Sequence, residues 1–192
     1  MNLLYIAFSS SIAYFITKIL YKRSNYIYIS TFIACLAGLI SYFAIYSDAL
    51  NNWVMLLHLY VTAMSITLLI IVSYEVFLLE WRVKKVKIGE FLDDIPFSIE
   101  RNYKTTFKLA GIGIMFLTLA LLSGFYITDI VTTEIQLKAL YTSISWLIYC
   151  SILIGTKYFN LKTKYAVRGL VFTLVFLLIA YMGNSYIFST IA

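Results

Sequence analysis

The segment that decides the fold spans residues 53–79 and reads WVMLLHLYVTAMSITLLIIVSYEVFLL. A transmembrane helix needs about 20 mostly apolar residues, whereas barrel strands alternate polar and apolar side chains over about 10 residues. The run LLIIV at 68–72 does not alternate. Because only a helix or a closed barrel satisfies its own backbone in lipid, the segment is predicted to be a membrane-spanning helix.

Five further apolar runs surround this segment and predict additional helices. They cover residues 2–21, 26–46, 107–127, 139–159 and 169–188. The 192 residues are 62% hydrophobic and 12% charged, against about 25% charged residues in soluble domains. The sequence therefore predicts an all-α integral membrane protein. We expect one membrane domain over residues 1–192, a bundle of six transmembrane helices in a lipid bilayer.

The basic residues predict how this bundle is oriented. Fourteen of the fifteen Lys and Arg residues fall in or beside the first, third and fifth connections, and Lys138 is the exception. Short loops rich in positive charge stay in the cytoplasm. We therefore expect both termini on the outer, periplasmic side of a bacterial cytoplasmic (inner) membrane, with residues 80–106 as a cytoplasmic loop. Trp53 and Trp81 are expected at the two membrane interfaces.

Two features at helix starts refine this prediction. No basic region precedes the run at 2–21, and its charges follow it instead, so the run is expected to be a retained span rather than a cleaved signal peptide. Within the loop at 80–106, Ser98 is a candidate N-terminal cap and Glu100 is expected in the first turn of the next helix.

Several function classes are disfavoured by the sequence. The net charge of +6 comes from residues beside apolar runs, which indicates membrane orientation rather than nucleic-acid binding. No metalloprotease, serine-hydrolase or phosphate-loop motif occurs, and no pair of intramembrane carboxylates, so an enzyme is not expected. Cys35 and Cys150 form no CxxC pair and are predicted to be free thiols.

Three ionisable residues are candidates for a functional site because charge within a membrane is costly. His58 lies just inside the outer end of its helix, where it can ligate haem iron or hydrogen-bond to a neighbouring helix. Lys138 is the one basic residue expected on the outer side, where it can pair with an acidic ligand group, snorkel to the interface, or pair with Asp129 or Glu134. Glu75 lies near the cytoplasmic end of its helix and is expected to pair with a basic residue of the loop at 80–106.

The order of several short motifs resembles the cytochrome c assembly (CcsA/HemX-type) membrane family, and more narrowly its YpjD-like branch. The motifs lie between residues 53 and 188. They are MLLH at 55–58, LLE at 78–80, IPFSIER at 95–101, LTLALLSGFY at 117–126, KALYTSISW at 138–146, RG at 168–169 and AYMGNS at 180–185. Relative to that family, the chain is expected to be shorter at its N-terminus by about two helices. It also lacks the tryptophan-rich motif between its fourth and fifth predicted helices.

The resemblance implies a haem-linked accessory protein that binds or hands over haem at the outer face during cytochrome c maturation. In this interpretation His58 is the candidate haem iron ligand and Lys138 offers charge to a propionate. A second ligand would come from Met182, another membrane protein or a second copy of the chain. Haem is thus the candidate cofactor.

Two other functions stay open. The chain could be a non-catalytic regulatory or interaction protein without haem, acting through its basic cytoplasmic loop. A small transporter subunit using Glu75 ranks below this, since neither internal symmetry nor interrupted helices are evident.

Overall fold

The computed structural model describes residues 2–21, 27–47, 53–89, 99–127 and 133–183. Within these ranges the chain is helical and contains no strand. Its elements are α1 (Asn2–Tyr21), α2 (Ile27–Tyr46), α3 (Trp53–Lys87), α4 (Ile99–Ile127), α5 (Thr133–Tyr158), α6 (Thr163–Leu178) and the π-helix η2 (Ile179–Gly183).

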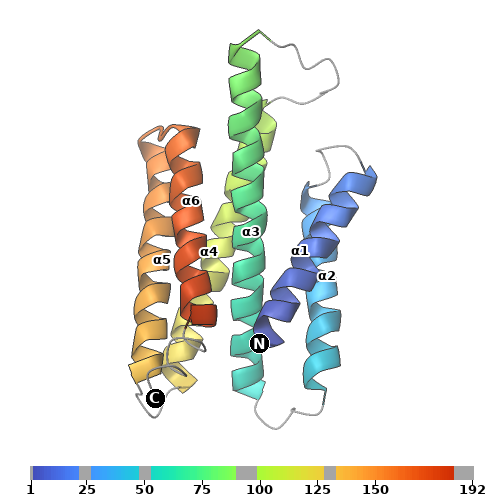
Figure 1. The fold of residues 1–192 in the computed structure, drawn as a ribbon, viewed down its shortest axis with the longest axis vertical. Helices are drawn as coiled ribbons and strands as arrows, with labels where there is room; N and C mark the ends of the chain where they lie inside the picture. The colour runs from blue at the N-terminus through green and yellow to red at the C-terminus, as the bar shows by residue number, and fades with distance from the viewer. Residues whose placement is uncertain (1, 22–26, 48–52, 90–98, 128–132, 184–192) are drawn as a thin grey trace.

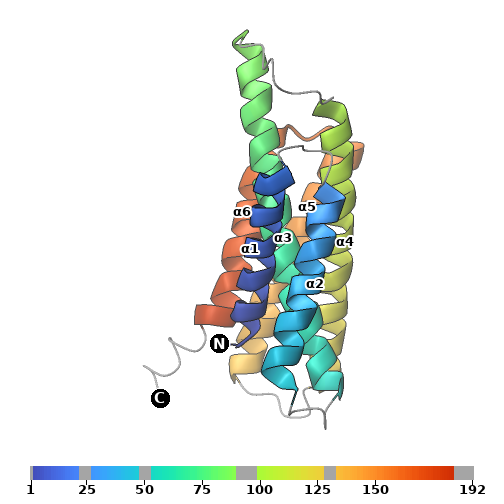
Figure 2. The same ribbon diagram turned by 90° about the vertical axis from the view of Figure 1, so that its right-hand side faces the viewer.

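The helices run alternately up and down, so the start of α1 and the end of η2 lie at the same end of the bundle (Figure 1). Helix α3 is central: it contacts α1, α2, α4 and α6. The α1–α2 pair lies on one side of α3 and the α5–α6 pair on the other (Figures 1 and 2). In the described residues, six helices are long and apolar enough to cross a membrane, as the sequence predicts for a multi-pass membrane protein.

The central position of α3 follows from its sequence. Every residue from Val61 to Leu69 is buried, which is possible only where other helices surround it. Ala63, Ser65 and Thr67 are small, and small side chains let helices in lipid approach closely. The outer surface is apolar: Ile19 is 72% exposed and Ile40 71% exposed. A water-soluble protein would bury such side chains, whereas lipid solvates them.

Several helices extend beyond the predicted apolar runs. Helix α3 continues to Lys87 and α4 begins at Ile99, so both enter the segment 80–106 that was predicted to be a loop. Salt bridges between residues four apart support both extensions: Lys84 pairs with Glu80 at 2.9 Å and Lys104 pairs with Glu100 at 2.7 Å. Hydropathy detects only the apolar part of a helix and misses such polar ends. Figure 1 shows α3 rising above the rest of the bundle.

Other predictions about single residues have mixed outcomes. Glu100 lies in the first turn of α4, as expected, whereas Ser98 lies outside the described residues. Cys35 and Cys150 are free, as predicted, and both are half-buried. Helices α5 and α6 begin at Thr133 and Thr163, six residues before the predicted starts.

Candidate functional site

A cavity of about 420 Å³ opens between α3, α4, α5 and η2, at the end of the bundle where α1 begins. Its walls are mostly apolar, and its polar side chains include His58, Lys138, Thr142 and Tyr181. Small-molecule and cofactor sites commonly have this character, with volumes of about 300–1,000 Å³ and a few convergent polar groups. His58 on α3 and Lys138 on α5 are two of the residues that the sequence singles out, and both line this cavity.

The imidazole of His58 is oriented by helix α4. Its Nδ1 lies 2.8 Å from the hydroxyl oxygen of Ser123. That hydroxyl has one proton, which it donates to the carbonyl of Leu119 at 2.7 Å. The ring also has a hydrogen-bonding neighbour in the backbone of Ala120. In the tautomer with the proton on Nδ1, Ser123 accepts from Nδ1–H and the lone pair is on Nε2.

Gly124 provides the space that the imidazole occupies beside α4. A Cβ atom at position 124 would lie 3.3 Å from Cε1 of His58, closer than ordinary van der Waals contact. The ring can pack this tightly against α4 because Gly124 has no side chain. The bond to Ser123 and the contact with Gly124 thus hold the imidazole against α4. Metal-binding histidines are commonly held by a hydrogen bond at the ring nitrogen that does not bind the metal.

Lys138 and Tyr181 complete the polar side of the cavity. Lys138 is half-buried at the start of α5. Tyr181 in η2 has the side chains of Thr62 and Thr142 as hydrogen-bonding neighbours. The cavity therefore combines an imidazole, an ammonium group and a phenol with an apolar interior. This set suits an apolar ligand that carries an anionic group.

Met182, the candidate second ligand, belongs to η2, but its side chain lies outside the described residues. The same holds for Asp129 and Glu134, the alternative partners considered for Lys138. Sequence reasoning missed Ser123 and Tyr181. The π-helical turn that carries Tyr181 is rare and often marks functional sites, but no sequence pattern announces it.

The side chains that line the cavity include one candidate iron ligand, the imidazole of His58. Among the described residues, no group of three or more His, Cys, Asp or Glu side chains could hold a bare metal ion. A haem needs from the protein only axial ligands, and Nε2 of His58 is such a donor.

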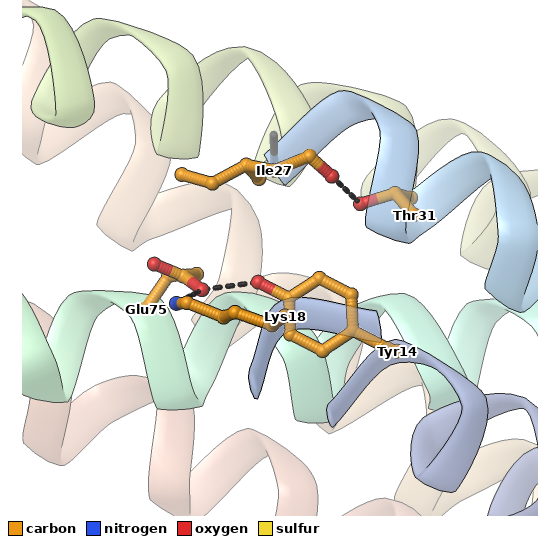
Figure 3. Close-up of polar contacts among 5 residues, drawn as sticks. All are labelled: Tyr14, Lys18, Ile27, Thr31 and Glu75. Carbon is orange, nitrogen blue, oxygen red and sulfur yellow. Dashed lines mark hydrogen bonds and ion pairs between the residues drawn. The ribbon is translucent and has the colours of Figure 1, made fainter. Parts of the chain in front are cut away.

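Glu75 lies in a separate polar cluster, in the half of α3 that ends at Lys87. Figure 3 shows the contacts of this cluster. The hydroxyl of Tyr14 and the ammonium group of Lys18, both on α1, donate to its Oε1. Glu75 is 3% exposed. The predicted pairing with a basic residue of the loop at 80–106 is therefore wrong. Lys18 is in the last turn of α1, where its side chain reaches across to α3 at the level of Glu75.

No protein-family model, curated protein or solved structure matches this chain. The resemblance to the cytochrome c assembly family therefore stays a prediction from the motifs. The functional argument rests on the His58 cavity itself.

Proposed function

We propose that this protein binds haem in the His58 cavity, as a haem-linked accessory protein of the cytochrome c assembly superfamily. The observation that carries the proposal is that His58 and Lys138, 80 positions apart in the sequence, line one largely apolar cavity. The bound haem would supply an iron centre and two carboxylates. The role is binding or hand-over to a partner, without covalent chemistry.

The residues of the cavity have distinct parts in this proposal. His58 offers Nε2 as one axial ligand, and its bond to Ser123 holds the ring in place. Lys138 offers a positive charge to a propionate, since charge-assisted hydrogen bonds are roughly twice as strong as neutral ones. Met55 and Phe125 supply apolar wall. A second ligand from Met182, a partner protein or a second copy remains part of the proposal.

The proposed location is the bacterial cytoplasmic membrane, with the His58 cavity at its outer face. Positive charge supports this orientation, because fourteen of fifteen Lys and Arg residues belong to the opposite side. The spacing of Trp53 and Trp81 on α3 supports a crossing of the whole bilayer by this helix. Their 28-residue separation corresponds to about 42 Å of helix, close to the about 40–45 Å of a bilayer with its headgroup regions.

Visible spectroscopy tests the proposal directly. The wild type and His58→Ala are purified in mild detergent from haem-replete cells, and haem is then added to each. We expect a Soret band in the wild type that is lost in His58→Ala, while size-exclusion elution stays the same. A wild type without a Soret band, even after haem addition, would overturn the proposal.

One observation favours a second candidate, a regulatory interaction protein without haem. The cytoplasmic end of α3 projects beyond the other helices and carries Lys84, Lys85 and Lys87 in its last turn (Figure 1). Such a basic projection is suited to an acidic partner. Replacing the three lysines by Gln would then abolish function in cells, whereas His58→Ala would leave it intact.

A further inference from the structure

Tyr181 of η2 links the two helices that carry His58 and Lys138. Its phenol has the side chains of Thr62 on α3 and Thr142 on α5 as hydrogen-bonding neighbours. Thr62 follows His58 by four residues on α3. Thr142 follows Lys138 by four residues on α5. Each threonine therefore lies about one helical turn deeper in the bundle, and Tyr181 joins α3 to α5 at that level.

The two threonines are oriented to accept hydrogen bonds from the phenol. The hydroxyl of Thr62 donates its proton to the carbonyl oxygen of His58 at 2.7 Å. The hydroxyl of Thr142 donates its proton to the carbonyl oxygen of Lys138 at 2.7 Å. A hydroxyl has one proton and two lone pairs, so each threonine keeps a lone pair for Tyr181. One threonine on each side thus connects the phenol to the backbone of residues 58 and 138.

Helices α3 and α5 are joined mainly through other elements. Helix α3 packs against α4 and α6, and α5 packs against α4, α6 and η2. Tyr181 packs against the main hydrophobic core and belongs to the π-helical turn η2, a rare element that often lies at functional sites. The separation of His58 and Lys138 therefore depends on the element that carries Tyr181.

This separation matters for a ligand that contacts both side chains. In the proposed complex, His58 binds the iron and Lys138 binds a propionate of the same rigid molecule. Both contacts form at full strength only when the two side chains are already held at the matching distance. A change in the spacing of α3 and α5 would keep one contact and weaken the other.

We propose that Tyr181 is a positioning residue of the haem site, which fixes the separation of His58 and Lys138 through its bonds to Thr62 and Thr142. It thereby selects a ligand whose metal and anionic group are at the matching distance. This inference rests on the proposed haem function and adds to it the residue that makes the charge of the ligand count. Tyr181 acts on the ligand through the other two side chains.

The spacing of α3 and α5 can be measured without haem. Spin labels are attached at Leu57→Cys on α3 and Leu140→Cys on α5, where the native side chains are 52% and 53% exposed. Cys35 and Cys150 are replaced by serine in this background. Pulsed electron paramagnetic resonance then compares Tyr181→Phe with the protein that keeps Tyr181. We expect a broader distribution of label distances in Tyr181→Phe, and an unchanged distribution would overturn the proposal.

Soret titrations with haem and haem dimethyl ester test the effect on specificity. Tyr181→Phe should bind haem about three- to ten-fold more weakly, the effect of losing one neutral hydrogen bond. The ester has no free carboxylate, so it should bind Tyr181→Phe and the wild type equally, with the same Soret maximum because His58 remains the ligand. Thr142→Val should show the same selective loss. The double variant should be no weaker than either single one, because both remove the same connection.

Tyr141→Phe on α5 is the matched control. The Tyr141 ring stacks on Phe176 with centroids 6.1 Å apart, and Tyr141 is not among the described residues that line the cavity. It should bind both compounds like the wild type. Equal losses for haem and ester in Tyr181→Phe would indicate a general loss of packing and overturn the positioning role. A wild type without a Soret band would overturn the haem proposal itself, whereas haem binding with unchanged label distances would overturn this inference alone.

Discussion

Lys18 on α1 and Glu75 on α3 form a buried ion pair that joins the two helices. The two residues are 57 positions apart in the sequence. Lys18 also lies over the ring of Tyr74, with its Nζ 5.0 Å from the ring centroid. Tyr14, one turn before Lys18, donates to the same carboxylate. This cluster is a polar connection between α1 and the central helix (Figure 3).

Replacing Glu75 by Gln should destabilise the protein. The amide can still accept a bond from Tyr14, but Lys18 loses its counter-charge within the bundle. Removing one partner of a buried pair costs about 3–5 kcal/mol, and we expect the lower end because the Lys18 side chain is 16% exposed. Denaturant unfolding in detergent measures this change.

Two further variants show whether the effect comes from the buried pair. Glu100→Gln breaks the exposed pair with Lys104 and should leave the unfolding midpoint unchanged. Lys18→Met combined with Glu75→Leu removes both charges and should restore much of the lost stability. If Glu75→Gln unfolds at the wild-type denaturant concentration, the pair does not stabilise the contact between α1 and α3.

The contact between Gly113 on α4 and Tyr149 on α5 gives a second prediction. A Cβ atom at position 113 would lie 2.9 Å from the Tyr149 hydroxyl, and Tyr149 is 1% exposed, so its rigid ring has little room to move. Gly113→Ala should therefore cost about 1–3 kcal/mol of unfolding free energy. Thermal unfolding in detergent provides the measurement.

The neighbouring Gly111 is the matched control, because no atom would lie within 4 Å of its added Cβ. Gly111→Ala should leave stability unchanged or slightly raised. The Tyr149 hydroxyl is buried and has no hydrogen-bond partner among the residues that the structure describes, so Tyr149→Phe should be tolerated and should rescue Gly113→Ala. Equal effects of the two alanine substitutions would rule out the close contact as the cause.

The six helices could be predicted from the sequence because length and hydropathy define a membrane span. Which side chains meet inside the bundle could not, because hydropathy does not fix the rotation of a helix about its axis. Glu75 illustrates the difference. Its place within a membrane span was expected, but its partner is Lys18 of α1 rather than a residue of the loop at 80–106.

The candidate site was predictable to a similar extent. His58 stands out as the one histidine of the chain, and Lys138 as the one basic residue on its side of the bundle. Ser123 and Tyr181 do not stand out, because hydroxyl side chains occur in every span and most of them bond only to their own helix. Their roles depend on the packing of α4 and η2 against α3 and α5.

The bond between Ser123 and His58 predicts an effect on haem affinity. Ser123→Ala removes the hydroxyl that is hydrogen-bonded to Nδ1 and leaves the imidazole less firmly oriented. Losing such a supporting partner typically weakens metal binding about 10–100-fold, so at least a ten-fold loss is expected in a haem titration. The control is Ser151→Ala on α5, which removes only a bond to the carbonyl of Leu147. Equal affinity of Ser123→Ala and the wild type would contradict the proposed role of Ser123.

A substitution of Lys138 can separate recognition of the ligand's charge from the apolar fit of the ligand in the cavity. If its ammonium group binds a propionate, Lys138→Gln should weaken the binding of haem by at least about ten-fold, since hydrogen bonds to charged groups contribute about 1.5–3 kcal/mol. Haem dimethyl ester has no free carboxylate, so Lys138→Gln and the wild type should bind it equally. Lys164→Gln, which changes a lysine far from the cavity, should bind both compounds like the wild type. Soret titrations measure all six affinities. A parallel loss for haem and its ester in Lys138→Gln would show that the lysine acts through packing rather than through charge.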